Sequence, residues 1–223
     1  MATSGTTSFN ITIDEVIEEA YERCGVRTNS GNDIRSARRS LNLLFSEWGN
    51  RGINLWKVKS KTETLVNGQV TYNTPSDCND VLEAVVTVSG GTQQSLTKIS
   101  RSEYIAIPNK TATGTPSQYY VDRQITPTIS LYLAPDTSAV TNIFYYYLAR
   151  IEDVGAYINT SDMPFRFFPC MVSGLAFYLC QKYQPQRCQE MKLYYEDELS
   201  RALEEDGSST SSFITPKTYY PSV

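Results

Sequence analysis

The chain has 223 residues, of which 40% are hydrophobic and 20% charged, and its net charge is −4. This composition is typical of a soluble globular protein. No apolar run approaches the ~18 residues of a membrane-spanning helix, and the first ten residues lack the pattern of a signal peptide. We therefore expect neither a membrane span nor an exported protein. Scattered basic residues also disfavour simple electrostatic binding to DNA.

The sequence contains few of the residues and motifs that are typical of enzyme active sites. It contains no histidine, which removes the commonest general base and the commonest metal ligand. No phosphate-binding loop, GxSxG or HExxH motif occurs. The carboxylate runs at positions 14–15, 18–19 and 204–206 are predicted to be solvated surface charge. We expect no catalytic residue, no cofactor and no metal site.

The cysteines are predicted to be free thiols made in a reducing compartment, because their number is odd and no CxxC pair occurs. Without histidine to activate it, a cysteine nucleophile is disfavoured. The five cysteines are Cys24, Cys78, Cys170, Cys180 and Cys188.

Residues 1–10 are small and polar, and we expect an arm there. Thr12 and Glu15 then form a capping box ahead of an apolar stripe that ends at Gly25, which predicts a short helix. The stripe consists of Ile13, Val16, Ile17, Ala20 and Cys24.

A long helix is predicted within the stretch 32–56, NDIRSARRSLNLLFSEWGNRGINLW, because its apolar residues recur at helical spacing. Gly49 and Gly52 are positions where this helix can end. With the preceding helix it is expected to form an antiparallel hairpin. Trp48 and Trp56 are predicted to meet at one structural junction as core residues. The opposite face, expected to be solvated, carries Arg35, Arg38, Arg39, Asn42 and Glu47.

From residue 57 the pattern becomes that of strands. Asn67-Gly68 predicts a type I′ hairpin between the runs 58–66 and 69–73, and a second hairpin is expected about Gly90-Gly91. Ser100 and Glu103 predict one capped helical turn. Three further strands are expected at 118–125, 128–134 and 140–149. About seven short strands in this region indicate an antiparallel sandwich or barrel.

Helical spacing returns after Asp162, where Pro164 lies near the first helical position and Pro169 predicts a kink or a late start. A last helix is expected from near Pro185 to Gly207. The first of these helices should bury Phe165, Phe168, Val172, Leu175, Ala176 and Leu179. The second should bury Cys188, Met191, Tyr195, Leu199, Ala202 and Leu203, with Asp197 and Arg201 paired one turn apart.

The segment 207–223, GSSTSSFITPKTYYPSV, has a Ser/Thr linker followed by an apolar, proline-punctuated part with Lys217 as its only charge. Such a segment cannot form its own core. We therefore expect an extended arm that docks on a neighbour through Phe213, Ile214, Tyr219 and Tyr220.

Tyrosine is unusually frequent, at 16 residues, and nine of these occur in runs. Tyrosine suits protein–protein contacts, but it is also common in β-strands. Both explanations remain open from the sequence alone.

These patterns predict an α+β fold. A four-helix domain formed by residues 1–56 and 156–206 would carry an inserted antiparallel β-sandwich or barrel domain at 57–155, followed by the C-terminal arm at 207–223.

Four blocks carry a resemblance to a family: ARRSLNLLFSEWGNRGINLW (37–56), GTPSQYYVDRQITPTISLYLAPD (114–136), DMPFRFFPCMVSGLAFYLCQKY (162–183) and YYEDELSRALEED (194–206). Together they resemble the head-to-tail adaptor proteins of short-tailed bacteriophages, of the tail tubular protein A type. The resemblance covers roughly residues 12–206.

The resemblance implies a structural protein of the virion and no enzyme. It implies a twelve-membered ring at the head–tail junction, between the portal protein ring and the tail nozzle protein, assembled in the host bacterial cytoplasm. DNA would pass through the lumen without specific binding. The helical domain and the C-terminal arm would face the portal, and the β domain would lie at the lower or outer surface.

Two other functions remain as alternatives. A tail-associated peptidoglycan hydrolase needs only two carboxylates at a suitable separation in space, although no residue matches such a role. A carbohydrate- or ligand-binding module would instead use the β domain and its tyrosines.

Overall fold

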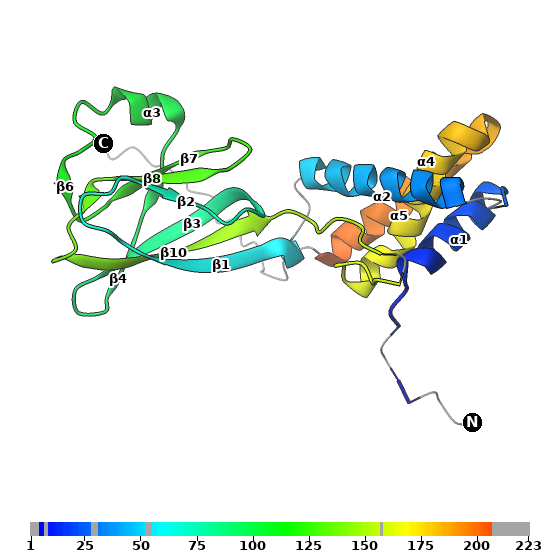
Figure 1. The fold of residues 1–223 in the computed structure, drawn as a ribbon, viewed down its shortest axis with the longest axis horizontal. Helices are drawn as coiled ribbons and strands as arrows, with labels where there is room; N and C mark the ends of the chain where they lie inside the picture. The colour runs from blue at the N-terminus through cyan, green and yellow to red at the C-terminus, as the bar shows by residue number, and fades with distance from the viewer. Residues whose placement is uncertain (1–4, 7–8, 28–30, 52–54, 157, 207–223) are drawn as a thin grey trace, which may run out of the picture.

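The computed structural model describes residues 5–6, 9–27, 31–51, 55–156 and 158–206, and its fold is of the mixed α+β class. Helices gather at one end of an elongated molecule and strands at the other (Figure 1). The longer helices are α1 (Ile13–Cys24), α2 (Gly31–Arg51), α4 (Phe168–Tyr183) and α5 (Cys188–Asp206), and α3 (Arg101–Ala106) lies in the β half. Three short 3₁₀ turns are η1 (Leu55–Lys57), η2 (Phe165–Phe167) and η3 (Pro185–Arg187).

The capping residues define the start and end of α1 as the sequence predicts. The Thr12 hydroxyl accepts a hydrogen bond from the Glu15 backbone, and the Glu15 carboxylate accepts one from the Thr12 N–H at 2.7 Å. Gly25 follows the helix with a φ of 75°, a left-handed conformation that favours glycine. The predicted short helix and its buried stripe are confirmed.

Helix α2 continues through Gly49 and ends at Arg51, so of the two positions where the sequence allows an end, Gly49 is not used. An interior glycine costs a helix only ~1 kcal/mol relative to alanine. The last turn is supported by Arg51, whose Nε donates to Glu47 at 2.8 Å. Gly52 lies outside the described residues.

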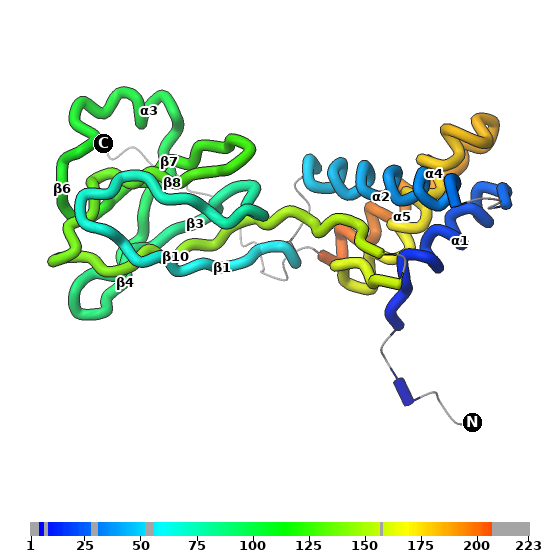
Figure 2. Tube along the Cα trace, viewed as in Figure 1, coloured from blue at the N-terminus to red at the C-terminus, as the bar shows by residue number. Residues whose placement is uncertain are grey.

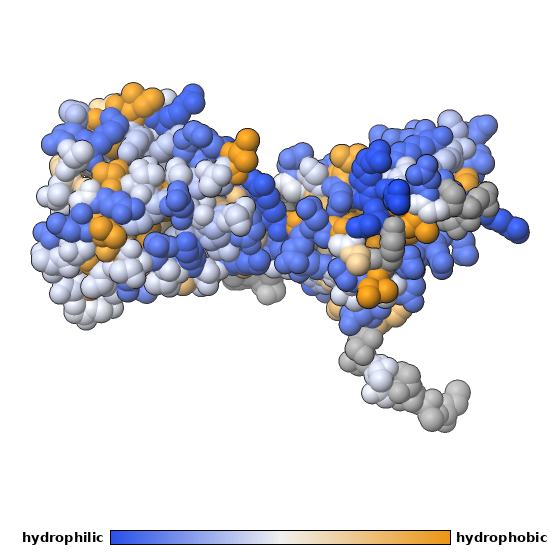
Figure 3. Space-filling view, viewed as in Figure 1, coloured by the Kyte–Doolittle hydropathy of each residue, from blue (hydrophilic) through white to orange (hydrophobic). Residues whose placement is uncertain are grey.

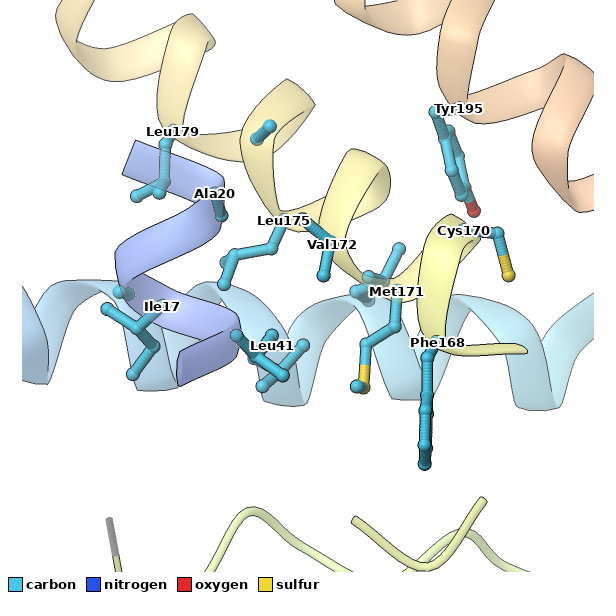
Figure 4. Close-up of a cluster of buried hydrophobic side chains, with 14 of the residues drawn as sticks. Ile17, Ala20, Leu41, Phe168, Cys170, Met171, Val172, Leu175, Leu179 and Tyr195 are labelled. Carbon is cyan, nitrogen blue, oxygen red and sulfur yellow. The ribbon is translucent and has the colours of Figure 1, made fainter. Parts of the chain in front are cut away.

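Helix α4 is the centre of the helical half, and α1, α2 and α5 all pack against it. Figure 4 shows its side chains Leu175 and Leu179 among those of α1 and α2. The predicted α1–α2 hairpin is therefore not the main contact, because these two helices touch each other little. Pro169 lies in the first turn of α4, after η2, which confirms the late start.

Close packing of α4 depends on Gly174. A Cβ atom at this position would lie 2.8 Å from Leu44 Cδ2 and 3.0 Å from the Tyr195 ring. Glycine thus allows α2 and α5 to approach α4 from two sides.

The polar face of α2 is partly buried against a segment that returns from the β half, so the expectation of a fully solvated face is wrong. The Asn42 side chain accepts a hydrogen bond from the Val154 backbone at 2.8 Å. Arg38 donates to the carbonyl oxygens of Val154, at 3.2 Å, and Gly155. These polar residues attach the returning chain to α2.

Two four-stranded sheets form the β half, with strand orders β1-β10-β3-β4 and β2-β8-β7-β5. They enclose one core, to which both sheets contribute side chains. In the described residues this core shares no buried side chain with the helical core. The strands are β1 (Val58–Thr64), β2 (Thr71–Asn73), β3 (Cys78–Val88), β4 (Gln93–Ser95), β5 (Thr97–Lys98), β6 (Thr113–Gly114), β7 (Gln118–Asp122), β8 (Thr128–Tyr132), β9 (Ala134–Pro135) and β10 (Val140–Ala149).

The predicted hairpin at Asn67-Gly68 does not form. Strand β1 pairs with β10, whereas β2 pairs with β8 in the other sheet, as the separate paths of the two segments in Figure 2 illustrate. Gly68 has a φ of 73°, but Asn67 does not have the positive φ that a type I′ turn needs. The turn instead moves the chain from one sheet to the other.

Other expectations for the β half are confirmed. Strands β3 and β4 form the hairpin around Gly90-Gly91, and Ser100 and Glu103 form the capping box of α3. The three later strand runs appear as β7, β8 and β10. One short parallel pair, β5 with β7, belongs to the second four-stranded sheet, and β6 and β9 form a separate two-stranded parallel sheet.

Candidate interaction surfaces

Trp48 and Trp56 both contact the ring of Phe167. The centroid of the Phe167 ring lies 6.0 Å from that of Trp48 and 4.3 Å from that of Trp56. Beside them, the Lys57 side chain is 2% exposed and forms an ion pair with Asp162, and burial lowers the pKa of this ammonium. These contacts join the chain entering β1 to the segment that begins α4.

A hydrogen-bonded network continues from Trp48 to the surface. Its indole N–H donates to the Tyr195 hydroxyl at 2.8 Å, and this hydroxyl donates to Glu47 at 3.1 Å. Arg51 contacts Glu47 and also Glu196, at 3.1 Å. Burial raises the pKa of Tyr195, which keeps the hydroxyl protonated. The network links α2 to α5, two helices far apart in sequence.

An apolar groove of about 720 Å³ lies where the N-terminal segment, α1 and the start of α4 meet. We call it the α1–α4 groove. Phe9 is 70% exposed and Phe165 75% exposed. Figure 3 shows hydrophobic residues on this half near the point where the N-terminal segment leaves α1. Exposed apolar surface of this kind marks interaction sites. The apolar walls consist of Phe9, Ile11, Phe165, Phe168, Pro169 and Val172.

Phe165 corrects a sequence expectation, because helical spacing placed it on the buried face of the returning helix. The residue instead lies in η2, before α4 begins, and points its ring away from the core. Phe168, one turn later, is buried and packs edge-on against Phe9 with centroids 6.1 Å apart.

The polar side of the groove consists of Glu15, Glu19 and Arg23 on α1. Arg23 donates to Glu19 at 2.9 Å and to the Ser173 hydroxyl of α4 at 2.8 Å. The hydrogen bonds from Thr12 lower the pKa of the Glu15 carboxyl. A glycosidase acid needs a raised pKa, so Glu15 is poorly suited to act as the acid in glycoside hydrolysis.

Asp206 is another correction, since the carboxylate run at 204–206 was expected to be surface charge. Its side chain is 5% exposed and forms an ion pair with Arg166 of η2. The last turn of α5 is thus attached next to Phe165 and Pro169, at the wall of the groove. Between Pro169 and this last turn lies a smaller depression, also lined by Ala202 and Glu205.

The described part of the chain contains no cluster of three or more His, Cys, Asp or Glu residues suited to hold a metal ion. All five cysteines are free, as predicted. Burial raises the pKa of Cys170 to about 12, so this thiol stays protonated at neutral pH. Within the described ranges, every helix is too short or too polar to cross a bilayer.

The sequence matches the protein family described as SU10 adaptor protein over residues 11–217. The chain belongs to the SU10 adaptor family. This membership confirms the resemblance to phage head-to-tail adaptors and identifies the chain as a structural adaptor protein of a bacteriophage, a component of the virion. The family is not a known enzyme family, and it implies association with portal and tail components. A comparison with curated proteins finds no match.

The adaptor's sequence-predicted contact residues divide into two groups. Trp48 and Trp56 meet at Phe167, as described above. The arm residues Phe213, Ile214, Tyr219 and Tyr220 lie outside the described residues. The α1–α4 groove was missed from the sequence. Phe9 precedes α1 and Phe165 precedes α4, and both are exposed. An aromatic residue just ahead of a helix start is the sequence signal that could have indicated this groove.

Proposed function

We propose that this adaptor forms a closed ring between the portal and the tail nozzle, with DNA passing through its lumen. The observation that carries the proposal is the family match over residues 11–217. A closed ring uses two different patches on each subunit. The elongated molecule has a helical end and a β end, which suits a subunit whose two ends face different neighbours, the portal and the tail (Figure 1).

In this proposal the helical segments 1–56 and 156–206 act as one domain that faces the portal. Support comes from the single core shared by α1, α2, α4 and α5. The inserted β domain, 57–155, contributes the lower or outer surface of the ring. The net charge of −4 suits a channel that must not hold passing DNA. We also propose that the ring has twelve subunits and that it is assembled in the host bacterial cytoplasm.

The C-terminal arm is proposed to bind the portal through Phe213, Ile214, Tyr219 and Tyr220. The test replaces these four residues with serine and measures binding of the full-length variant to assembled portal rings of the same phage. A control variant replaces only residues 208–212 with a Gly/Ser sequence of equal length. We expect the first variant to lose binding and the control to retain it.

Circular dichroism must show that both variants keep the fold. Undiminished portal binding by the serine variant would remove the arm from the proposal. Rings seen by negative-stain electron microscopy, in the presence of portal, would test the closed assembly separately.

A further inference from the structure

The α1–α4 groove has no role in the proposal above, yet it leaves aromatic surface open on the helical half. Phe9 and Phe165 are 70% and 75% exposed, although the adjoining Phe168 is buried. The groove's volume of about 720 Å³ falls within the ~300–1,000 Å³ of clefts that bury drug-sized ligands. It can therefore accept several apolar side chains.

The last described residue, Asp206, lies near this groove without lining it. Asp206, the last residue of α5, is paired with Arg166, whose neighbour Phe165 forms a wall. Pro169 lines both the groove and the depression beside the last turn of α5. Phe213 follows Asp206 by seven residues, which span at most about 25 Å when extended. The arm is thus long enough to reach the groove.

The arm also has matching chemistry. Residues 213–220, FITPKTYY, supply apolar and aromatic groups, and Lys217 is their only charge. The polar rim of the groove has two carboxylates, Glu15 and Glu19, against one cation, Arg23. The opposite terminus matches poorly, because residues 1–8 are small and polar.

We propose that in the free protein the arm segment Phe213–Tyr220 occupies the α1–α4 groove of its own chain. The aromatic residues of the arm and groove then cover each other, and Lys217 lies near Glu15 and Glu19. This arrangement concerns the chain before it meets a portal, and it does not depend on the portal-binding proposal. The groove is then the intramolecular binding site of the arm.

Photocrosslinking of the full chain tests this directly. Phe213 is replaced by benzoylphenylalanine, and cross-linked peptides are identified by mass spectrometry in an equal mixture of ¹⁴N- and ¹⁵N-labelled protein without portal. The expected partners are peptides that contain Ile11–Arg23 or Phe165–Val172, with both halves carrying the same isotope. Mixed-isotope pairs would show a second copy as the occupant and overturn the proposal, as would cross-links confined to other surfaces or none.

A matched pair of variants gives the second measurement. Phe165→Ser removes an exposed groove ring, whereas Leu193→Ser changes a residue of α5 that is 64% exposed and does not line the groove. Neither change removes a buried side chain, so both proteins should fold. Phe165→Ser should lose most of the cross-link and Leu193→Ser should keep it. Equal yields in the two variants would contradict the proposal.

Discussion

In the helical half, a buried tryptophan and a buried tyrosine share hydrogen bonds that continue to Glu47 and Arg51 at the surface. In the β half, the ion pairs Lys59–Asp77 and Lys61–Glu63 lie on the outside, and the core between the sheets is chiefly apolar. The comparison shows two ways of specifying a fold. Polar contacts join distant helices at one end, and strand pairing sets the register at the other.

The two halves are expected to respond separately to core truncation, because their cores share no buried side chain in the described residues. Leu175 of α4 and Leu131 of β8 are both 0% exposed, which makes them a matched pair. Each Leu→Ala change should lower the free energy of unfolding of its own half by ~2–5 kcal/mol.

Both tryptophans of the chain lie in or against the helical core, so their fluorescence reports that half. Urea titrations should show a lower fluorescence midpoint for Leu175→Ala and an unchanged one for Leu131→Ala. Circular dichroism should detect the effect of Leu131→Ala. A single shared midpoint in every variant would show that the halves unfold together and that the comparison is wrong.

A smaller effect is expected from removing one hydroxyl in each half. The Tyr195 hydroxyl takes part in two hydrogen bonds, to Trp48 and Glu47, whereas the Tyr119 hydroxyl donates only to the Leu82 carbonyl, at 2.9 Å. Tyr195→Phe leaves a buried indole N–H unpaired and should cost ~1–3 kcal/mol.

Tyr119→Phe should cost ~0.5–1.5 kcal/mol, the usual net value of one neutral hydrogen bond. The same urea titrations, followed by circular dichroism, measure both changes. Equal costs for the two variants would show that the network adds nothing beyond an ordinary hydrogen bond.

Acid should weaken the helical half through Glu196, whose pKa is lowered from 4.5 chiefly by the hydrogen bond from Arg51. Its folded pKa is below its unfolded pKa, so its stabilisation is present above about pH 4.5 and is lost as the pH falls through the folded pKa. Because this ion pair is partly exposed, the loss should stay under ~1 kcal/mol.

Glu196→Gln should reduce the loss of unfolding free energy below about pH 4.5, as measured by tryptophan-monitored unfolding. The control Asp136→Asn, in the β half, should leave it unchanged. Between about pH 5 and 8 stability should stay level, since the chain has no histidine to titrate there. A steep slope near pH 6.5 would contradict this account.

The smallest effect is expected at Arg201, which pairs with Asp197 on the exposed face of α5. Arg201→Ala should change the free energy of unfolding by less than ~0.5 kcal/mol, because an exposed pair one turn apart contributes little. Thermal unfolding at low and high salt measures it. A loss comparable with that of Tyr195→Phe would mean that surface charges stabilise this half as much as its buried network.

Local signals in the sequence predicted much of the fold. The capping pairs Thr12–Glu15 and Ser100–Glu103 act within one turn and were found by spacing alone. The Asn67-Gly68 prediction was wrong because the partners of the flanking strands, β10 and β8, lie some 55 to 90 residues further along the chain. A turn motif predicts that the chain changes direction. It does not predict which strands will pair.

The groove was beyond prediction for a similar reason. Its walls come from the N-terminal segment and from the start of α4, some 150 residues away. Phe165 has the spacing of a core residue, and only the late start caused by Pro169 turns it to the surface. Likewise, the sequence does not distinguish Asp206 from the charged residues before it. Its burial depends on the ion pair with Arg166, which lies 40 residues earlier in the chain.

The central proposal, that this adaptor assembles on the portal, is tested most directly by sedimentation velocity. The purified protein is run alone and with assembled portal rings of the same phage. We predict that it co-sediments with the rings at a fixed, saturating stoichiometry, and that the portal peak moves to a higher sedimentation coefficient. A protein that sediments separately from the portal at every ratio would contradict the account.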